Sequence, residues 1–217
     1  SGFVMPAAAL LFMSRFLLIV VVAIFAGDAV AGEATWGNLR YTLVRPVGRA
    51  RLLAAKLAMA LVFVVIATLL VVFTGLIAGG LAFGWHRIDV NFAGFFSLHK
   101  SSAQLLADLG IASAYVAWNM TTIVAMALMV STMTDSSNGA IGAGIGLFMT
   151  SEILDAIPQL GSLRNGFPTH YLDDWRGLIV RQDSASGLLH GVLVQLPYLA
   201  LLLAIAFWWF RRKDVLS

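Results

Sequence analysis

Residues 57–83 form an apolar run without a single charged side chain. A helix of about 20 apolar residues crosses the hydrocarbon core of a bilayer, so this run is long enough to span it. The composition of the whole chain also indicates a membrane protein. Of its 217 residues, 60% are hydrophobic and 12% are charged, whereas soluble domains have about 25% charged residues. Such a composition has too little polar surface for a soluble globule and too little charge for a disordered chain. The sequence therefore predicts an all-α, polytopic integral membrane protein.

Four further apolar runs have spanning length, and we expect one transmembrane domain over residues 1–217. The five predicted spans cover residues 6–30, 57–83, 103–133, 139–157 and 188–210. Apolar sequence begins almost directly after Ser1, so we also expect a sixth, N-terminal span ahead of Ser1. Residues 31–56 then connect the first two of the five spans, and residues 158–187 connect the last two.

The distribution of Lys and Arg predicts the orientation, because these residues are enriched in short cytoplasmic loops. Eight fall in residues 31–56 and in the C-terminal tail: Arg40, Arg45, Arg49, Arg51, Lys56, Arg211, Arg212 and Lys213. Five fall in the loops at the other side: Arg87, Lys100, Arg164, Arg176 and Arg181. We therefore expect residues 31–56 and the C-terminus to be cytoplasmic, with the protein in the plasma (inner) membrane of a bacterium. The net charge of +3 then reflects loop orientation and does not indicate a nucleic-acid partner.

The connector 31–56 has internal structure. Leu39, Leu43 and Val44 recur at helical spacing, and Pro46 disfavours helix at the residue before it. This pattern predicts a short helix along the membrane, followed by a basic turn. Two interpretations remain open: an ordinary solvated positive loop, or an element placed to receive force from a cytosolic partner.

The same segment resembles the type-2 ATP-binding-cassette (ABC) exporter permease family. The resemblance is carried by Glu33, Gly37, Leu39, Leu43, Arg45, Pro46, Arg49, Arg51 and Lys56, and by the tail 207–214, which is similar to the basic Phe-Arg-Arg-Asp ending of those permeases. It implies a six-span transport subunit that forms a dimer with a second copy or a related permease. It also implies two cytosolic ATPase subunits, which hold ATP and Mg²⁺ and dock on a coupling helix that includes Arg40. Glu33 would then lie at the hinge between span and connector.

The chain has no phosphate-binding loop of the G-x-x-x-x-G-K-[ST] type, and its glycine-rich stretch 139–146 contains no Lys. We therefore expect no ATPase site, catalytic residue, cofactor or metal in this chain. Two small-xxx-small pairs, Gly75 with Gly79 and Gly142 with Gly146, permit close helix approach. They would serve either tight packing or a surface that slides between transport states.

A few polar side chains interrupt the predicted spans. A charge at the bilayer centre costs roughly 2.5–3.5 kcal/mol, so each charge needs a partner or water. Arg15 lies in the first span, and Glu152 and Asp155 precede Pro158 at similar expected depth. We predict that Arg15 lies close to Glu152, with Asp155 as second choice, either as an outer gate or as a structural ion pair. Asn119 is a hydrogen-bonding candidate for helix packing or substrate.

The loop 158–187 is amphipathic. Its apolar residues at 171, 172, 175, 178 and 179 follow helical spacing, which predicts a short interfacial helix or a partial re-entrant hairpin over the exit path. Pro197 should kink the last span.

The resemblance implies the membrane subunit of an ATP-driven exporter that moves a hydrophobic or amphipathic drug, lipid or peptide by alternating access. The alternative is an ion-gradient-driven transporter, which needs a buried carboxylate near mid-membrane; the sequence places Glu152 too near the outer end for that. A membrane enzyme is a third class, but the sequence shows no nucleophile–base arrangement.

Overall fold

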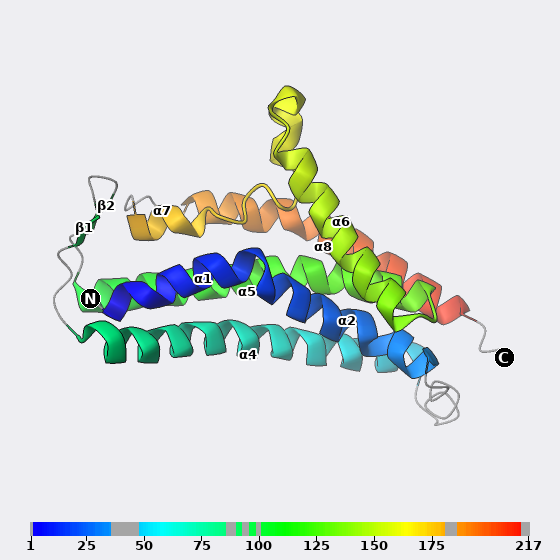
Figure 1. Ribbon diagram of the computed structural model, residues 1–217. Coiled ribbons are helices and arrows are strands. Elements are labelled where there is room, and N and C mark those ends of the chain that lie inside the picture. Colours follow the sequence, from blue (N-terminus) through cyan, green and yellow to red (C-terminus); the bar gives the residue numbers. More distant parts are fainter. Residues whose placement is uncertain are drawn as a thin grey trace.

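The computed structural model describes residues 2–35, 48–85, 90–92, 96–98, 101–180 and 186–213, and most of them are helical. The elements are η1 (Gly2–Val4), α1 (Met5–Arg15), α2 (Leu17–Thr35), α4 (Arg49–Phe83), β1 (Val90–Phe92), β2 (Phe96–Leu98), α5 (Ser102–Met133), α6 (Ser137–Asp155), η2 (Pro158–Gly166), α7 (Trp175–Val180) and α8 (Ser186–Arg212). The two strands form one short antiparallel pair. The long helices run along a common axis (Figure 1).

Four helices are long and apolar enough to cross a membrane: α2, α4, α5 and α8. These four helices confirm the prediction of a helical, membrane-embedded protein. The predicted fourth span corresponds to α6, which has 19 residues but is not among the four. Its glycines and its two carboxylates, Glu152 and Asp155, make it less apolar than the others. The count of five spans therefore stays a prediction.

The first predicted span is divided into two helices at its charged residue. α1 ends at Arg15, and Phe16 has a non-helical backbone with φ −141° and ψ −66°. α1 packs mainly on α4, whereas α2 packs on α5 and α6. The break lets the chain change neighbours halfway along the bundle, as the bend between α1 and α2 shows (Figure 1).

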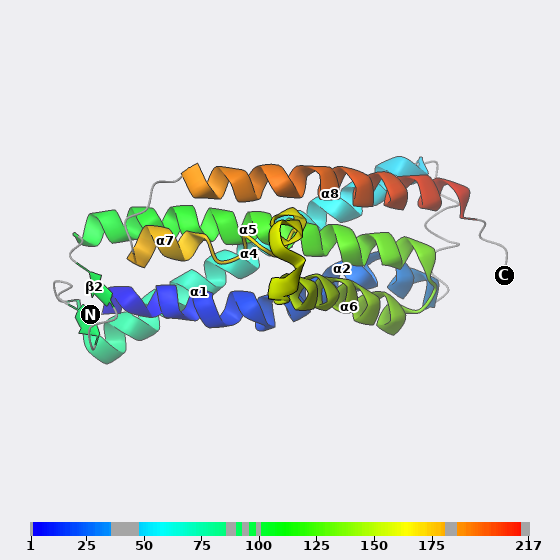
Figure 2. The ribbon, with the colours of Figure 1, turned by 90° about the horizontal axis from the view of Figure 1, so that it is seen from above.

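Helix α5 forms the centre of the bundle. It packs against α2, α4, α6, α7 and α8, and in the view from above it lies between α8 and the α1–α2 pair (Figure 2). Its buried face combines small and branched residues, such as Ala112, Val116, Ile123 and Ala127. In a membrane these residues bring no hydrophobic gain between helices, so close van der Waals packing holds the bundle together.

Of the two predicted glycine pairs, one lies at a close contact between helices and the other does not. A Cβ atom on Gly75 would lie 2.7 Å from Pro6 Cα, and one on Gly79 would collide with the carbonyl of Gly2, so this pair lets α4 approach the start of the chain. A Cβ atom on Gly142 or Gly146 would meet no heavy atom of the described residues within 4 Å. On α6 the tight contact belongs to Gly144, whose Cβ would lie 2.8 Å from Ala127.

The bundle has two distinct ends. The N-terminus, the end of α4 and the start of α5 lie at one end, which we call the N-terminal end (Figure 1). The end of α2, the start of α4, the α5–α6 turn and the end of α8 lie at the other, the connector end (Figure 1). The sequence assigns residues 31–56 and the C-terminal tail to the cytoplasm. The described parts of both segments therefore lie at the same end of the molecule.

The segment after α6 returns into the bundle. α6 diverges from the other helices, η2 projects sideways, and the chain then comes back to α7, which lies along α5 (Figure 1). Within this returning segment, residues 167–180, the apolar side chains of Tyr171, Trp175, Leu178 and Ile179 are buried. Of the two forms that the sequence predicts here, this path is nearer to a partial re-entrant hairpin than to an interfacial helix, because the apolar face packs on the bundle. Only 175–180 are α-helical, and α8 continues as one helix through Pro197.

Candidate functional site

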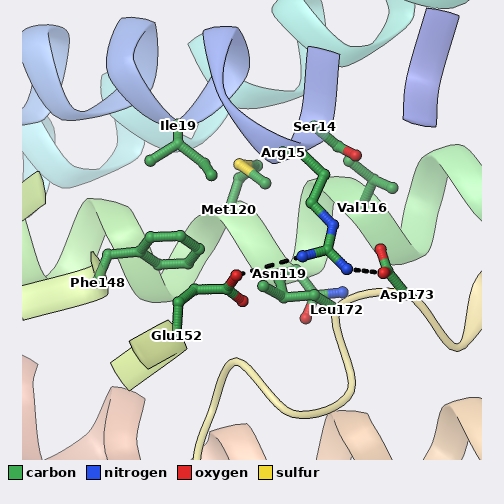
Figure 3. A pocket seen from close by; sticks show the side chains of 10 residues that line it. All are labelled: Ser14, Arg15, Ile19, Val116, Asn119, Met120, Phe148, Glu152, Leu172 and Asp173. Atoms are coloured by element: carbon green, nitrogen blue, oxygen red, sulfur yellow. Dashed lines mark hydrogen bonds and ion pairs between the residues drawn. The ribbon is translucent and has the colours of Figure 1, made fainter. Parts of the chain in front are cut away.

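A cluster of charges lies where three elements meet. Arg15, the last residue of α1, places one guanidinium nitrogen 3.3 Å from Glu152 Oε2 on α6. The other terminal nitrogen contacts the carboxylate of Asp173 in the returning segment. Figure 3 shows the Arg15 side chain between the two acids. The predicted proximity of Arg15 and Glu152 is confirmed, and Asp173 is a partner that the sequence did not predict.

The second-choice partner, Asp155, makes different contacts. Its Oδ1 lies 2.6 Å from His170 Nδ1 and 3.6 Å from Arg164 Nε. Arg176 in turn lies 3.0 Å from Asp173. Glu152 thus pairs with the end of α1, whereas Asp155 pairs with the segment that follows α6, so the prediction of an Arg15–Asp155 contact is wrong.

The cluster lies at mid-height of the bundle. α1 runs antiparallel to α4, with Gly2 opposite Gly79 and Pro6 opposite Gly75, so Arg15 falls level with about residue 66 at the middle of α4. The neighbouring residues of α5, Val116 to Met120, are also central in that helix. The expectation that Glu152 lies near the outer end is wrong. α6 leaves the bundle sideways at mid-height and does not continue to its end, so counting back from Pro158 overestimates how close Glu152 is to the outer surface (Figure 1).

A small cavity adjoins the ion pairs. Its lining is Ser14, Arg15, Ile19, Val116, Asn119, Met120, Phe148, Glu152, Leu172 and Asp173 (Figure 3). Apolar side chains of α2, α5 and α6 form one side, and the charged groups with Asn119 form the other. The cavity leaves room for about one water molecule. In this conformation the site is closed, so any cargo would need the surrounding elements to separate.

Buried polar side chains hold the non-helical part of the returning segment. Gln195 of α8, fully buried, donates to the Asn119 side-chain oxygen and, at 3.4 Å, to the carbonyl of Pro168. Thr122 donates to Gln195 Oε1 at 3.3 Å, and Tyr115 donates to the carbonyl of Tyr171 at 2.8 Å. Non-helical backbone at membrane depth needs such partners, because lipid offers none. Asn119 therefore acts in packing here, which was the first of its two expected roles.

Gln195 is a site residue that the sequence did not single out. Its signal is a lone amide inside the apolar run of the last span, two residues before Pro197. Such a residue predicts a buried partner, but the sequence does not say that the partner is backbone from residues 166–171. In the described part of the chain, no three His, Asp or Glu side chains come together in a way that could hold a metal ion.

A second set of contacts fastens the helices at the connector end. Glu33 of α2 lies 2.7 Å from Lys56 of α4, which also donates to the carbonyl of Ala29. Thr35 donates to the carbonyl of Asp135 at 2.7 Å, and the Asp135 carboxylate lies 2.7 Å from Lys213. The helices on both sides of the connector are thereby tied to each other and to the C-terminal end of the chain.

Four of the eight predicted coupling residues, Gly37, Arg40, Arg45 and Pro46, lie outside the described residues. Arg49 donates to the carbonyls of Arg211 and Lys213 at 3.1 and 2.8 Å, and Arg51 is exposed. Glu33, which the resemblance places at the hinge, contacts Lys56 on the neighbouring helix α4. The coupling role of these residues stays a prediction.

The membrane-length helices, the broken first span and the returning polar segment define a polytopic α-helical membrane protein with a charge cluster inside its bundle. The chain belongs to the DUF2705 family, described as proteins of unknown function, whose model matches residues 2–216. No curated protein matches it in sequence. A function is therefore inferred from the residues themselves.

Proposed function

We propose that the protein is the transmembrane subunit of an ATP-driven exporter. Its cargo would be a hydrophobic or amphipathic drug, lipid or peptide, and ATP would be hydrolysed by separate cytosolic subunits that hold ATP and Mg²⁺. The resemblance of residues 31–56 and 207–214 to type-2 ABC permeases supports this proposal. The absence of a phosphate-binding loop from the sequence is consistent with hydrolysis on another chain.

The observation that carries the proposal is the path from the connector to the charge cluster. The connector leaves α2 at Thr35, directly beyond the Glu33–Lys56 ion pair. From there α2 runs for 19 residues, about 28 Å, to the break at Phe16. A force applied to the connector by an ATPase would therefore move a rigid helix whose other end adjoins Arg15. In this arrangement α2 would transmit movement from a cytosolic ATPase to the site beside Arg15.

Alternating access would proceed through the contacts of Arg15. The guanidinium holds α1 against both α6 and the returning segment, and the cavity beside it is closed. Movement of α2 would separate these three elements and open the apolar side of the cavity to cargo. Two permease copies, or this chain and a related one, would rock about a shared interface as ATP binding draws the ATPase subunits together.

The discriminating experiment is purification of the full-length protein from its native membranes, with mass spectrometry of the subunits that accompany it. We expect an ATP-binding subunit to co-purify, and Arg45→Glu in the connector to abolish that association. Arg87→Glu, the same charge reversal in a loop expected on the opposite side, is the matched control. Association that persists in Arg45→Glu, or that is lost equally in both variants, would contradict coupling through the connector.

Ion-gradient-driven transport is the second candidate, and one observation favours it. Glu152 and Asp173 lie at mid-height of the bundle, where gradient-driven transporters place their coupling carboxylates. In vesicles without ATP, this mechanism predicts uptake driven by a pH gradient and its loss in Glu152→Gln. Transport that requires a co-reconstituted ATPase, and that a pH gradient alone does not drive, would exclude it.

A further inference from the structure

Two tryptophans mark the membrane boundary at the connector end. Trp208 and Trp209 lie near the end of α8 with ring centroids 5.9 Å apart. They are 49% and 42% exposed, which is unusual for the largest apolar side chain. Trp at the end of a membrane-length helix occupies the headgroup region of a bilayer. These side chains therefore lie where lipid headgroups meet the protein.

A hollow adjoins the two rings. It is shallow and open to the outside, has a volume of about 430 Å³ and is lined by Met133, Ala204, Ile205, Trp208 and Trp209. Every lining side chain is apolar, and the hollow lies between the end of α5 and the last turns of α8. Its position, just inside the tryptophan level, is where the upper part of an acyl chain lies in a bilayer.

Four arginines gather at the same end of the molecule. Arg49 donates to the carbonyls of Arg211 and Lys213, which brings the start of α4 to the end of α8. Arg51 follows on α4, and the Arg212 guanidinium lies 4.3 Å from the centre of the Trp208 ring. Among the described residues, none of these four arginines has a carboxylate within ion-pair distance.

The two neighbouring lysines differ from the arginines in this respect. Lys56 lies 2.7 Å from Glu33, and Lys213 lies 2.7 Å from Asp135, so both are neutralised within the chain. Like charges that gather at one end of a molecule repel each other unless an anion lies among them. The described part of the chain thus presents a cationic group without a matching acid, directly beside an apolar hollow at headgroup level.

We propose that this end of α8 binds an anionic phospholipid. The phosphate lies against the guanidinium groups of Arg211 and Arg212, with Arg49 and Arg51 adding to the field, and the adjoining acyl chain fills the hollow beside Trp208. Clusters of Lys and Arg next to a membrane helix attract anionic lipids in this way. An acidic protein surface would match the charges, but it would leave the apolar hollow unfilled, so the lipid fits both features.

The test measures lipids retained by the purified full-length protein, using native mass spectrometry after titration with phosphatidylglycerol or phosphatidylcholine. We expect the wild type to prefer phosphatidylglycerol. The double variant Arg211→Gln/Arg212→Gln should weaken its binding by on the order of tenfold. Trp208→Ala should weaken it without any change in net charge. Lys213→Gln is the matched control: it removes a neighbouring charge that Asp135 already neutralises, so it should keep the preference.

Size-exclusion chromatography checks that each variant remains folded, and Arg212→Gln alone replaces the double variant if that one does not. Equal binding of the two lipids by the wild type would overturn the proposal, as would an equal loss of preference in Lys213→Gln. Loss of a co-purifying ATP-binding subunit in the double variant, with lipid preference intact, would assign the arginines to a protein partner instead. The lipid measurement needs no ATPase, so it succeeds or fails independently of the exporter proposal.

Discussion

Arg15 and Glu152 are separated by 137 positions in the chain, yet their charged groups lie 3.3 Å apart at mid-height of the bundle. The contact joins the end of α1 to the last turn of α6. Asp173 shares the same guanidinium, so one side chain connects three elements. Because the energy of a charge in lipid depends on its partners, this relationship is expected to dominate the stability of the site.

A double-mutant cycle tests the Arg15–Glu152 pair. We expect Arg15→Leu and Glu152→Leu each to lower the free energy of unfolding by about 2 kcal/mol, because each leaves a charge with fewer partners. The double variant should lose less than the sum, with a coupling energy of about 1 kcal/mol or more. Reversible unfolding in detergent micelles, followed by circular dichroism, provides the measurement. Strictly additive losses would show that the two groups do not interact.

Gln195→Leu tests the support of the returning segment. The substitution removes the donor to Pro168 and the acceptor for Thr122, so we expect about 2 kcal/mol of destabilisation. Amide hydrogen exchange should rise within residues 166–174, which depend on these bonds. Tyr198→Phe is a milder comparison, since it removes a single 2.6 Å bond to the carbonyl of Gly166. Unchanged exchange in Gln195→Leu would mean that the segment is held by packing alone.

The glycines of α6 allow a matched pair of substitutions. Gly144→Val should destabilise the protein by about 1–3 kcal/mol, because even its Cβ would lie 2.8 Å from Ala127. Gly142→Val meets open space in the single chain and should leave monomer stability unchanged. Thermal unfolding of both variants in detergent provides the comparison. A weaker dimer in Gly142→Val alone would place a second copy of this chain on this face, whereas equal destabilisation of the two monomers would contradict the packing described above.

The Glu33–Lys56 pair links the connector to the exporter proposal. Its side chains are largely buried, 31% and 12% exposed, and we expect Glu33→Lys to lower stability by about 1 kcal/mol through loss of the pair and like-charge repulsion. The double reversal Glu33→Lys/Lys56→Glu should restore most of that loss. If the connector transmits force, the single variant should also reduce transport-linked ATP hydrolysis in the reconstituted complex, and the double reversal should recover it. Full transport-linked ATP hydrolysis in Glu33→Lys alone would show that this ion pair takes no part in the transport cycle.

Part of the site was predictable because charges in apolar sequence are few. Arg15 needs an acid, and Glu152 was an acid at a comparable expected depth, so their contact followed from the energy of burying charge. Asp173 and Gln195 were not predictable in the same way. Their roles depend on the returning segment: its helical spacing predicts an apolar face, but not the helices against which that face packs.

The sequence by itself determined the membrane class, the extents of α5 and α8 to within two residues and the end of α4, since long apolar runs must form helices in lipid to satisfy their backbone groups. It also determined which charges needed partners. Only the tertiary structure decided that the first span breaks at Phe16, that α6 ends at mid-height and that residues 167–180 return along α5. These features arise from contacts between segments far apart in the chain, in which buried Gln195 and Tyr115 supply hydrogen bonds that local sequence cannot provide.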